Sequence, residues 1–117
     1  MLTDQDLLIG TYRAFNARDI DTVLDVTHSD VIWSNGWEGG TLHGQQALRD
    51  YWIRQWKAID PSVEPIGFNV KGDGRLLVTV HQVVRDLDGN IIDDRIVGHV
   101  FLIEDGAIRS MEIMKLE

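Results

Sequence analysis

The sequence predicts an α+β fold, in which helices from the first half of the chain pack against a curved sheet formed mainly by the second half. Apolar residues recur at helical spacing up to residue 59, whereas apolar runs alternate with Asp-Gly turns from residue 66 onward. Helices followed by strands, without regular alternation, are typical of α+β domains. The length of 117 residues fits one domain, residues 1–117.

Three stretches in the first half are predicted to be helices. The first has Thr3 as a candidate N-cap and an apolar stripe at helical spacing. A shorter helix follows Asp19, and a third runs from about residue 44 to residue 59, where Asp60-Pro61 ends it. A short strand and a glycine-rich loop separate the second helix from the third.

The second half predicts four long strands joined by hairpin turns. Asp-Gly pairs between apolar runs stand at residues 73–74, 88–89 and 105–106. If each pair is a two-residue type I′ turn, it fixes which residues of the neighbouring strands pair and share a face. One face then carries Phe68, Leu77, Thr79, His81, Asp94, Ile96 and Gly98. We take it as the inner face, because the apolar residues of its first strand all lie on it.

The opposite face, predicted to be the outer one, carries a row of large apolar side chains. These are Val78, Val80, Val84, Val97, Phe101, Ile103, Ile108 and Met114. So much apolar surface on a solvent-facing side favours burial against a partner. We therefore predict a homodimer formed through the outer face of the sheet.

Composition and charge exclude several classes of partner. The net charge of −8 disfavours nucleic acid and anionic membranes, and no apolar run approaches the roughly 20 residues of a membrane span. The N-terminal segment lacks the pattern of a signal peptide, which predicts a cytoplasmic protein. The chain has no cysteine, and its four histidines show no metal-ligand spacing, so we expect neither a metal nor another cofactor.

The order of the predicted elements and three motifs resemble the nuclear transport factor 2-like superfamily, in particular its SnoaL-like, ketosteroid isomerase-like branch. The motifs span residues 12–19, 42–47 and 101–108. The resemblance implies a cone-shaped sheet, mixed or antiparallel, wrapped around three helices in the order α-α-β-α-β-β-β-β, with an interior pocket for a small molecule. It leaves the activity open, because this fold hosts isomerases, dehydratases, cyclases, epoxide hydrolases and non-catalytic modules.

Two positions separate this chain from the ketosteroid isomerases of the family, which use an aspartate base and a protonated aspartic acid in the oxyanion hole. Matching the family motifs puts Asn35 at the base position and Gly98 at the oxyanion position. An amide does not accept a proton as a carboxylate does, and glycine has no side chain to donate from. The resemblance therefore implies the pocket, placed next to Gly98, without ketosteroid isomerase activity.

His81 and Asp94 are the predicted catalytic residues. The predicted register makes Asp94 a diagonal neighbour of His81 on the inner face, and a histidine oriented by a carboxylate is a common general base. The alternative is a structural histidine beside an ion pair of Asp94 with Arg85 at the rim of the sheet. His99 is predicted to face outward, as a polar residue of the subunit interface.

The predicted ligand-binding residues gather aromatic side chains and one amide that would orient a ligand. They are Tyr12, Trp33, Asn35, Trp37, Trp56 and Phe68. We expect a cofactor-independent enzyme that transfers a proton on a small apolar or aromatic carbonyl compound. A non-catalytic ligand-binding protein and a dimeric interaction module with a vestigial pocket are the alternatives.

Overall fold

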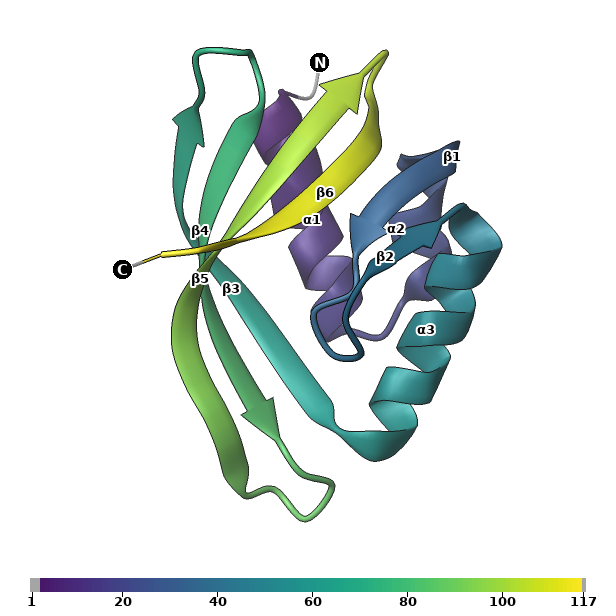
Figure 1. Ribbon diagram of the computed structural model, residues 1–117, viewed down its shortest axis with the longest axis vertical. Helices are drawn as coiled ribbons and strands as arrows, with labels where there is room; N and C mark the ends of the chain where they lie inside the picture. Colours follow the sequence, from purple (N-terminus) through teal and green to yellow (C-terminus); the bar gives the residue numbers. More distant parts are fainter. Residues whose placement is uncertain (1–2, 117) are drawn as a thin grey trace.

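A computed structural model describes residues 3–116 of the chain (Figure 1). Its helices are α1 (Asp4–Asn16), α2 (Ile20–Asp25) and α3 (Gln45–Ala58). Its strands are β1 (Thr27–Ser34), β2 (Thr41–His43), β3 (Asp60–Val70), β4 (Leu76–Arg85), β5 (Ile91–Glu104) and β6 (Ala107–Lys115). The short edge strand β2 was not predicted, and β1 is longer than expected.

The strands form one mixed, curved sheet in the order β2-β1-β6-β5-β4-β3. Neighbouring strands are antiparallel, except that β1 runs parallel to β6. The sheet is open, so β2 and β3 are its edges. Figure 1 shows the long strands β3–β6 bending along one side of the molecule, opposite α3, β1 and β2. The predicted α+β fold with a curved sheet around three helices is confirmed.

Helix α1 is fixed at both ends by side chains. At its start, Asp6 donates its backbone N–H to the Thr3 hydroxyl at 3.1 Å and accepts the Thr3 backbone N–H at 3.3 Å, which is a capping box. At its end, the Asn16 amide accepts the N–H of Val63 at 3.0 Å and donates to the carbonyl of Val63 at 2.8 Å. These contacts position α1 against edge strand β3.

The turn between β3 and β4 is longer than predicted. A type I′ turn needs positive φ at both central residues, but in Asp73-Gly74 only the glycine has it, at 86°. The N–H of Lys71 bonds to the carbonyl of Arg75 at 2.8 Å, so three residues rather than two form the loop. This one extra residue shifts the pairing of the two strands by one position.

The shift places each side chain of β4 and β5 on the face of the sheet opposite to the predicted one. Phe68 pairs with Val78, not with Thr79, and paired residues share a face. The concave face therefore carries Val78, Val80, Gln82, Val84, Asp93, Arg95, Val97, His99 and Phe101. The convex outer face carries Leu77, Thr79, His81, Asp94, Ile96 and Gly98. The prediction that His81, Asp94 and Gly98 lie on the inner face is wrong for this reason.

The other two hairpins each contain a β-bulge. The turn at residues 88–89 also has three loop residues, but a bulge beside Arg85 restores the predicted pairing of His81 with Ile96. The turn at residues 105–106 is a two-residue turn with positive φ at both positions, as predicted. A bulge beyond it shifts β6, so that His99 lies opposite Ile113.

The apolar row assigned to a dimer interface is mostly the core of the monomer. Val78, Val80 and Ile108 are 0% exposed and Phe101 is 1% exposed. They pack with the apolar faces of α1 and α3 in one buried cluster. Met114, by contrast, lies on the outer face opposite Gly98. The reason given for the dimer is therefore corrected, because this row is already buried within a single chain.

Candidate functional site

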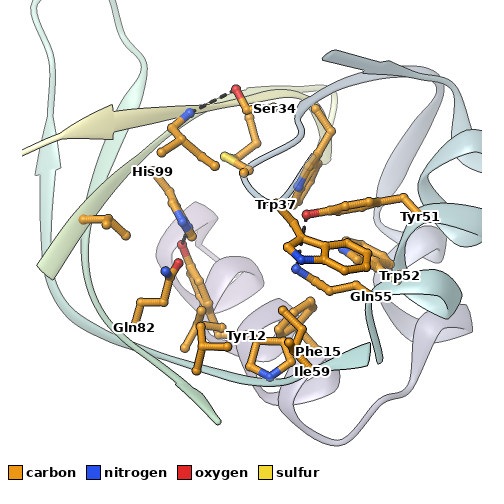
Figure 2. A pocket seen from close by; sticks show the side chains of 18 of the residues that line it. Tyr12, Phe15, Ser34, Trp37, Tyr51, Trp52, Gln55, Ile59, Gln82 and His99 are labelled. Atoms are coloured by element: carbon orange, nitrogen blue, oxygen red, sulfur yellow. Dashed lines mark hydrogen bonds between the residues drawn. The ribbon is translucent and has the colours of Figure 1, made fainter. Parts of the chain in front are cut away.

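A cavity of about 340 Å³ lies between the concave face of the sheet and helices α1 and α3. Its walls are mainly apolar and aromatic (Figure 2). The aromatic side chains that line it are Tyr12, Phe15, Trp33, Trp37, Tyr51, Trp52 and Phe101. A concave, aromatic pocket with a few placed polar groups is the usual form of a small-molecule site.

A buried pair of polar side chains, Tyr12 of α1 and His99 of β5, faces this cavity. The Tyr12 hydroxyl lies 2.7 Å from Nδ1 of His99, and the two rings stack with centroids 5.8 Å apart. Burial lowers the pKa of His99 to about 4 and raises the pKa of Tyr12 well above its usual value. Both groups are therefore neutral at neutral pH. Within residues 3–116, Nε2 of His99 has no hydrogen-bond partner.

His99 makes the stability of the protein depend on pH. Its pKa is lowered from 6.5 to about 4 by folding, so the unfolded chain binds a proton more tightly. The stabilisation is complete above pH 6.5 and is lost as the pH falls toward 4. Such a shift corresponds to about 3 kcal/mol. We expect the free energy of unfolding, measured by urea denaturation across this range, to fall more steeply for the native protein than for His99→Phe. Equal slopes would contradict the neutral, buried state of His99.

A second polar pair comes from helix α3. Gln55 lies one helical turn after Tyr51 and donates its amide N–H to the Tyr51 hydroxyl at 3.2 Å. Burial raises the pKa of Tyr51 to about 12. The other amide atom, Oε1 of Gln55, is buried and has no hydrogen-bond partner within residues 3–116. Figure 2 shows Tyr51 and Gln55 on one side of the pocket and Tyr12 and His99 on the other.

Charged residues stand at one end of the pocket lining. Asp93 accepts hydrogen bonds from Gln82 at 3.1 Å and from Arg95 at 3.0 Å. Among the described lining residues, Asp93 is the one carboxylate. It lies six positions before His99 on β5, which is roughly 20 Å along a strand. No carboxylate of the described lining residues therefore lies next to His99.

Three of the six predicted ligand-binding residues line the pocket: Tyr12, Trp33 and Trp37. Asn35 does not, because its side chain is used locally. Its carbonyl oxygen accepts the backbone N–H groups of Trp37 at 3.2 Å and Glu38 at 2.7 Å, and its amide N–H bonds to the Glu38 carboxylate at 3.0 Å. Asparagine often makes such turns. The amide that was expected to orient a ligand holds the loop after β1 instead.

Trp56 and Phe68 are absent from the pocket lining. Trp56 stacks on Trp52 with centroids 6.0 Å apart, and the Arg18 guanidinium lies 5.0 Å from its ring. Phe68 is partly buried against the core cluster. Both residues support the site through packing, and the prediction that they line the cavity is corrected.

His81 and Asp94 form a pair, but outside the pocket. Nε2 of His81 lies 2.7 Å from Oδ1 of Asp94, as the β4–β5 register predicts. Both side chains project from the convex face, are partly exposed, and are absent from the cavity lining. A proton on His81 therefore has no direct route to a molecule in the cavity.

Sequence reasoning missed His99 and Gln55, although each leaves a signal. His99 alternates with Val97 and Phe101 in the row of large apolar residues, and such a row marks the buried face of a strand. Gln55 interrupts the apolar face of the third helix between Trp52 and Trp56. A polar residue on a buried face needs a partner, so both positions indicate a site.

Within residues 3–116, no helix is long and apolar enough to cross a membrane. In the same part of the chain, no three His, Asp or Glu side chains gather closely enough to hold a metal ion.

Comparisons with solved structures identify proteins of the same fold. TerC, co-crystallized with polyporic acid, has a TM-score of 0.82 at 24% identity, covering 95% of this chain and 89% of that chain. A nuclear transport factor 2-like protein of unknown function from Burkholderia pseudomallei has a TM-score of 0.84 at 24% identity, covering 99% and 92%. A candidate polyketide cyclase from Sinorhizobium meliloti has a TM-score of 0.79 at 25% identity, covering 93% and 94%.

None of the curated proteins matches the chain in sequence. A family description does match: that of the SnoaL-like domain, over residues 9–111. The match includes α3, β5 and the part of α1 that carries Tyr12, so it covers both polar pairs of the pocket. The chain therefore belongs to the SnoaL-like domain family.

Proposed function

We propose that the pocket binds a small apolar or aromatic carbonyl compound, and that His99 transfers a proton on this compound without a cofactor. The observation that supports this proposal is the buried Tyr12–His99 pair, which faces an aromatic cavity. A histidine held by a hydrogen bond on one ring nitrogen leaves the other nitrogen for the substrate. The reaction would belong to the isomerase, dehydratase or cyclase type.

His99 would act as the base in one of its two tautomers. When Nδ1–H is donated to the Tyr12 hydroxyl, the lone pair of Nε2 is left to accept a proton from a carbon next to a carbonyl group. A pKa of about 4 keeps the imidazole unprotonated at neutral pH but makes it a weak base. So weak a base requires a carbon whose protons are acidified by both a carbonyl group and a ring.

The related structures support the same class of ligand. One is named as a candidate polyketide cyclase, and TerC was crystallized with polyporic acid. The name and the ligand belong to the related proteins and not to this chain. For this chain they favour a small organic molecule in the pocket.

Non-catalytic binding is the second candidate function. It is favoured by the lack of a carboxylate beside His99 among the described lining residues. In that case His99 would only donate a hydrogen bond to the bound carbonyl oxygen. The two functions share the pocket and differ in whether a proton leaves the ligand.

Ligand binding is tested with naphthylacetone, an aromatic ketone of suitable size. We expect Trp37→Ala to weaken its affinity, measured by calorimetry, by about tenfold, because the indole lines the cavity and would cover the ring of the ligand. Trp56→Phe is the control, since Trp56 packs outside the cavity, and its affinity should stay unchanged. Unchanged affinity in Trp37→Ala would show that the ligand binds elsewhere.

A homodimer through the outer sheet face and a cytoplasmic location stay predictions. In the structure, the apolar side chains on the outer face are mostly not the predicted ones, and they include Ile96, which is 43% exposed. Exposed apolar residues on a sheet face favour association. The mass of the protein in solution, with Ile96→Asp for comparison, tests the dimer.

A further inference from the structure

We infer that the pocket selects an aromatic carbonyl compound that carries a hydroxyl group at the end remote from its carbonyl. Tyr51 and Gln55 recognise this hydroxyl. The inference rests on the proposed function, because it takes the carbonyl end to lie at His99.

The first observation is an unsatisfied polar pair in the wall of the cavity. Gln55 is 9% exposed and lines the pocket, and the one hydrogen bond of its side chain within residues 3–116 is the donation to the Tyr51 hydroxyl. Its Oε1 has no partner there, and the Tyr51 hydroxyl acts only as an acceptor. Buried polar groups are nearly always paired, and an unpaired one is unfavourable. The pair is therefore incomplete until a ligand or a water molecule binds.

The second step identifies the chemical group that would complete the hydrogen bonding of Tyr51 and Gln55. Oε1 of Gln55 needs a donor, and the Tyr51 O–H needs an acceptor. A hydroxyl group supplies both at once. Turning the Gln55 amide by 180° exchanges its two atoms and leaves the same requirement for one donor and one acceptor. The terminal torsion of glutamine is soft, so Oε1 can turn toward a hydroxyl seated on Tyr51.

The third step places this hydroxyl on an aromatic ring. The Trp37 ring lies beside Tyr51, with centroids 6.4 Å apart, and both rings line the cavity. Trp33 and Trp52, which also line it, meet edge to face at 5.6 Å. Such walls favour a flat ring as the ligand. Since Tyr51 and Gln55 face His99 across the pocket in Figure 2, the hydroxyl and the carbonyl occupy opposite ends of the molecule.

Three probes test the inference: naphthylacetone and its derivatives with a hydroxyl or a methoxy group on the remote ring. For the native protein, we expect calorimetry to give about tenfold tighter binding of the hydroxy probe than of naphthylacetone. The methoxy probe should gain no such advantage, because it lacks the proton that Gln55 accepts. Gln55→Leu should abolish the preference for the hydroxy probe over naphthylacetone.

Gln46→Leu is the matched control, since Gln46 lies on the exposed side of the same helix and bonds to Asp50 at 3.0 Å. It should keep the tenfold preference. Tyr51→Phe is a second variant that should lose it, and circular dichroism verifies folding of each variant. Equal affinities of the native protein for naphthylacetone and its hydroxy derivative, or a preference that survives in Gln55→Leu, would overturn the inference and leave the proposed function standing. Failure of all three probes to bind would overturn both.

Discussion

Replacing His99 with phenylalanine is expected to slow proton exchange of a bound aromatic ketone by about 10²–10⁴-fold, the usual contribution of a general acid–base group. Phenylalanine replaces the imidazole with another aromatic ring that has no nitrogen, so an aromatic contact with Phe101, whose ring centroid lies 6.2 Å away, is retained. Naphthylacetone is a suitable probe, because its methylene lies between a ring and a carbonyl. Loss of the methylene signal in D₂O, followed by NMR and corrected for buffer exchange, measures the rate.

His81→Phe is the matched control for this experiment. It makes the same chemical change at the histidine that pairs with Asp94 on the convex face, outside the cavity. The exchange rate should be unchanged in this variant. If His81→Phe were slow and His99→Phe fast, the outer pair would be the site of proton transfer. If the native protein did not accelerate exchange at all, non-catalytic binding would replace the enzymatic proposal.

Replacing Phe101 is expected to have the largest effect on stability. The side chain is 1% exposed and makes edge-to-face contacts with Tyr12 at 6.1 Å and Trp33 at 6.0 Å. Phe101→Ala should lower the free energy of unfolding by about 3–5 kcal/mol, because it removes buried surface and leaves a cavity. Phe101→Asp should prevent folding, since it buries an unpaired charge. Denaturation followed by circular dichroism measures both effects.

Met114→Ala serves as the comparison, because Met114 lies on the outer face and is 39% exposed. Its effect on the free energy of unfolding should be much smaller than that of Phe101→Ala. A folded Phe101→Asp protein that differs only in oligomeric state would show that Phe101 faces outward, and would reject the register described above.

The sequence was sufficient for the helices and the long strands but not for the faces of the sheet. Helical periodicity and Asp-Gly turns depend on local geometry, and they located the helices and the long strands. The face of β4, however, depends on whether the turn at residues 73–74 has two or three loop residues. Asp-Gly suits both, because a type I turn followed by a left-handed glycine also forms a hairpin. One residue of difference places His81 outside the pocket and His99 inside it.

Site residues that belong to an apolar pattern could be predicted from the sequence. Site residues whose role depends on a hydrogen-bond partner far away in the chain were missed. Tyr12 and Trp33 follow from periodicity. His99 acquires its role from Tyr12, a residue 87 positions earlier, and no local pattern reports that contact. Asn35, by contrast, was predicted to bind the ligand and does not line the pocket. Its own loop satisfies its amide, so a strong local hydrogen-bonding preference outweighs the role expected in the pocket.

The contact between Asn16 and edge strand β3 has a consequence for solubility. An open sheet exposes unpaired backbone groups at its edges, which are templates for addition of another chain and for aggregation. Here the Asn16 amide occupies both backbone groups of Val63, as a neighbouring strand would. Arg18 bonds to the carbonyl of Pro61 at 2.7 Å, and proline has no N–H to offer. At the opposite edge, β2 has only three residues. The first part of β3 and the short β2 edge thus offer few free backbone groups for strand addition.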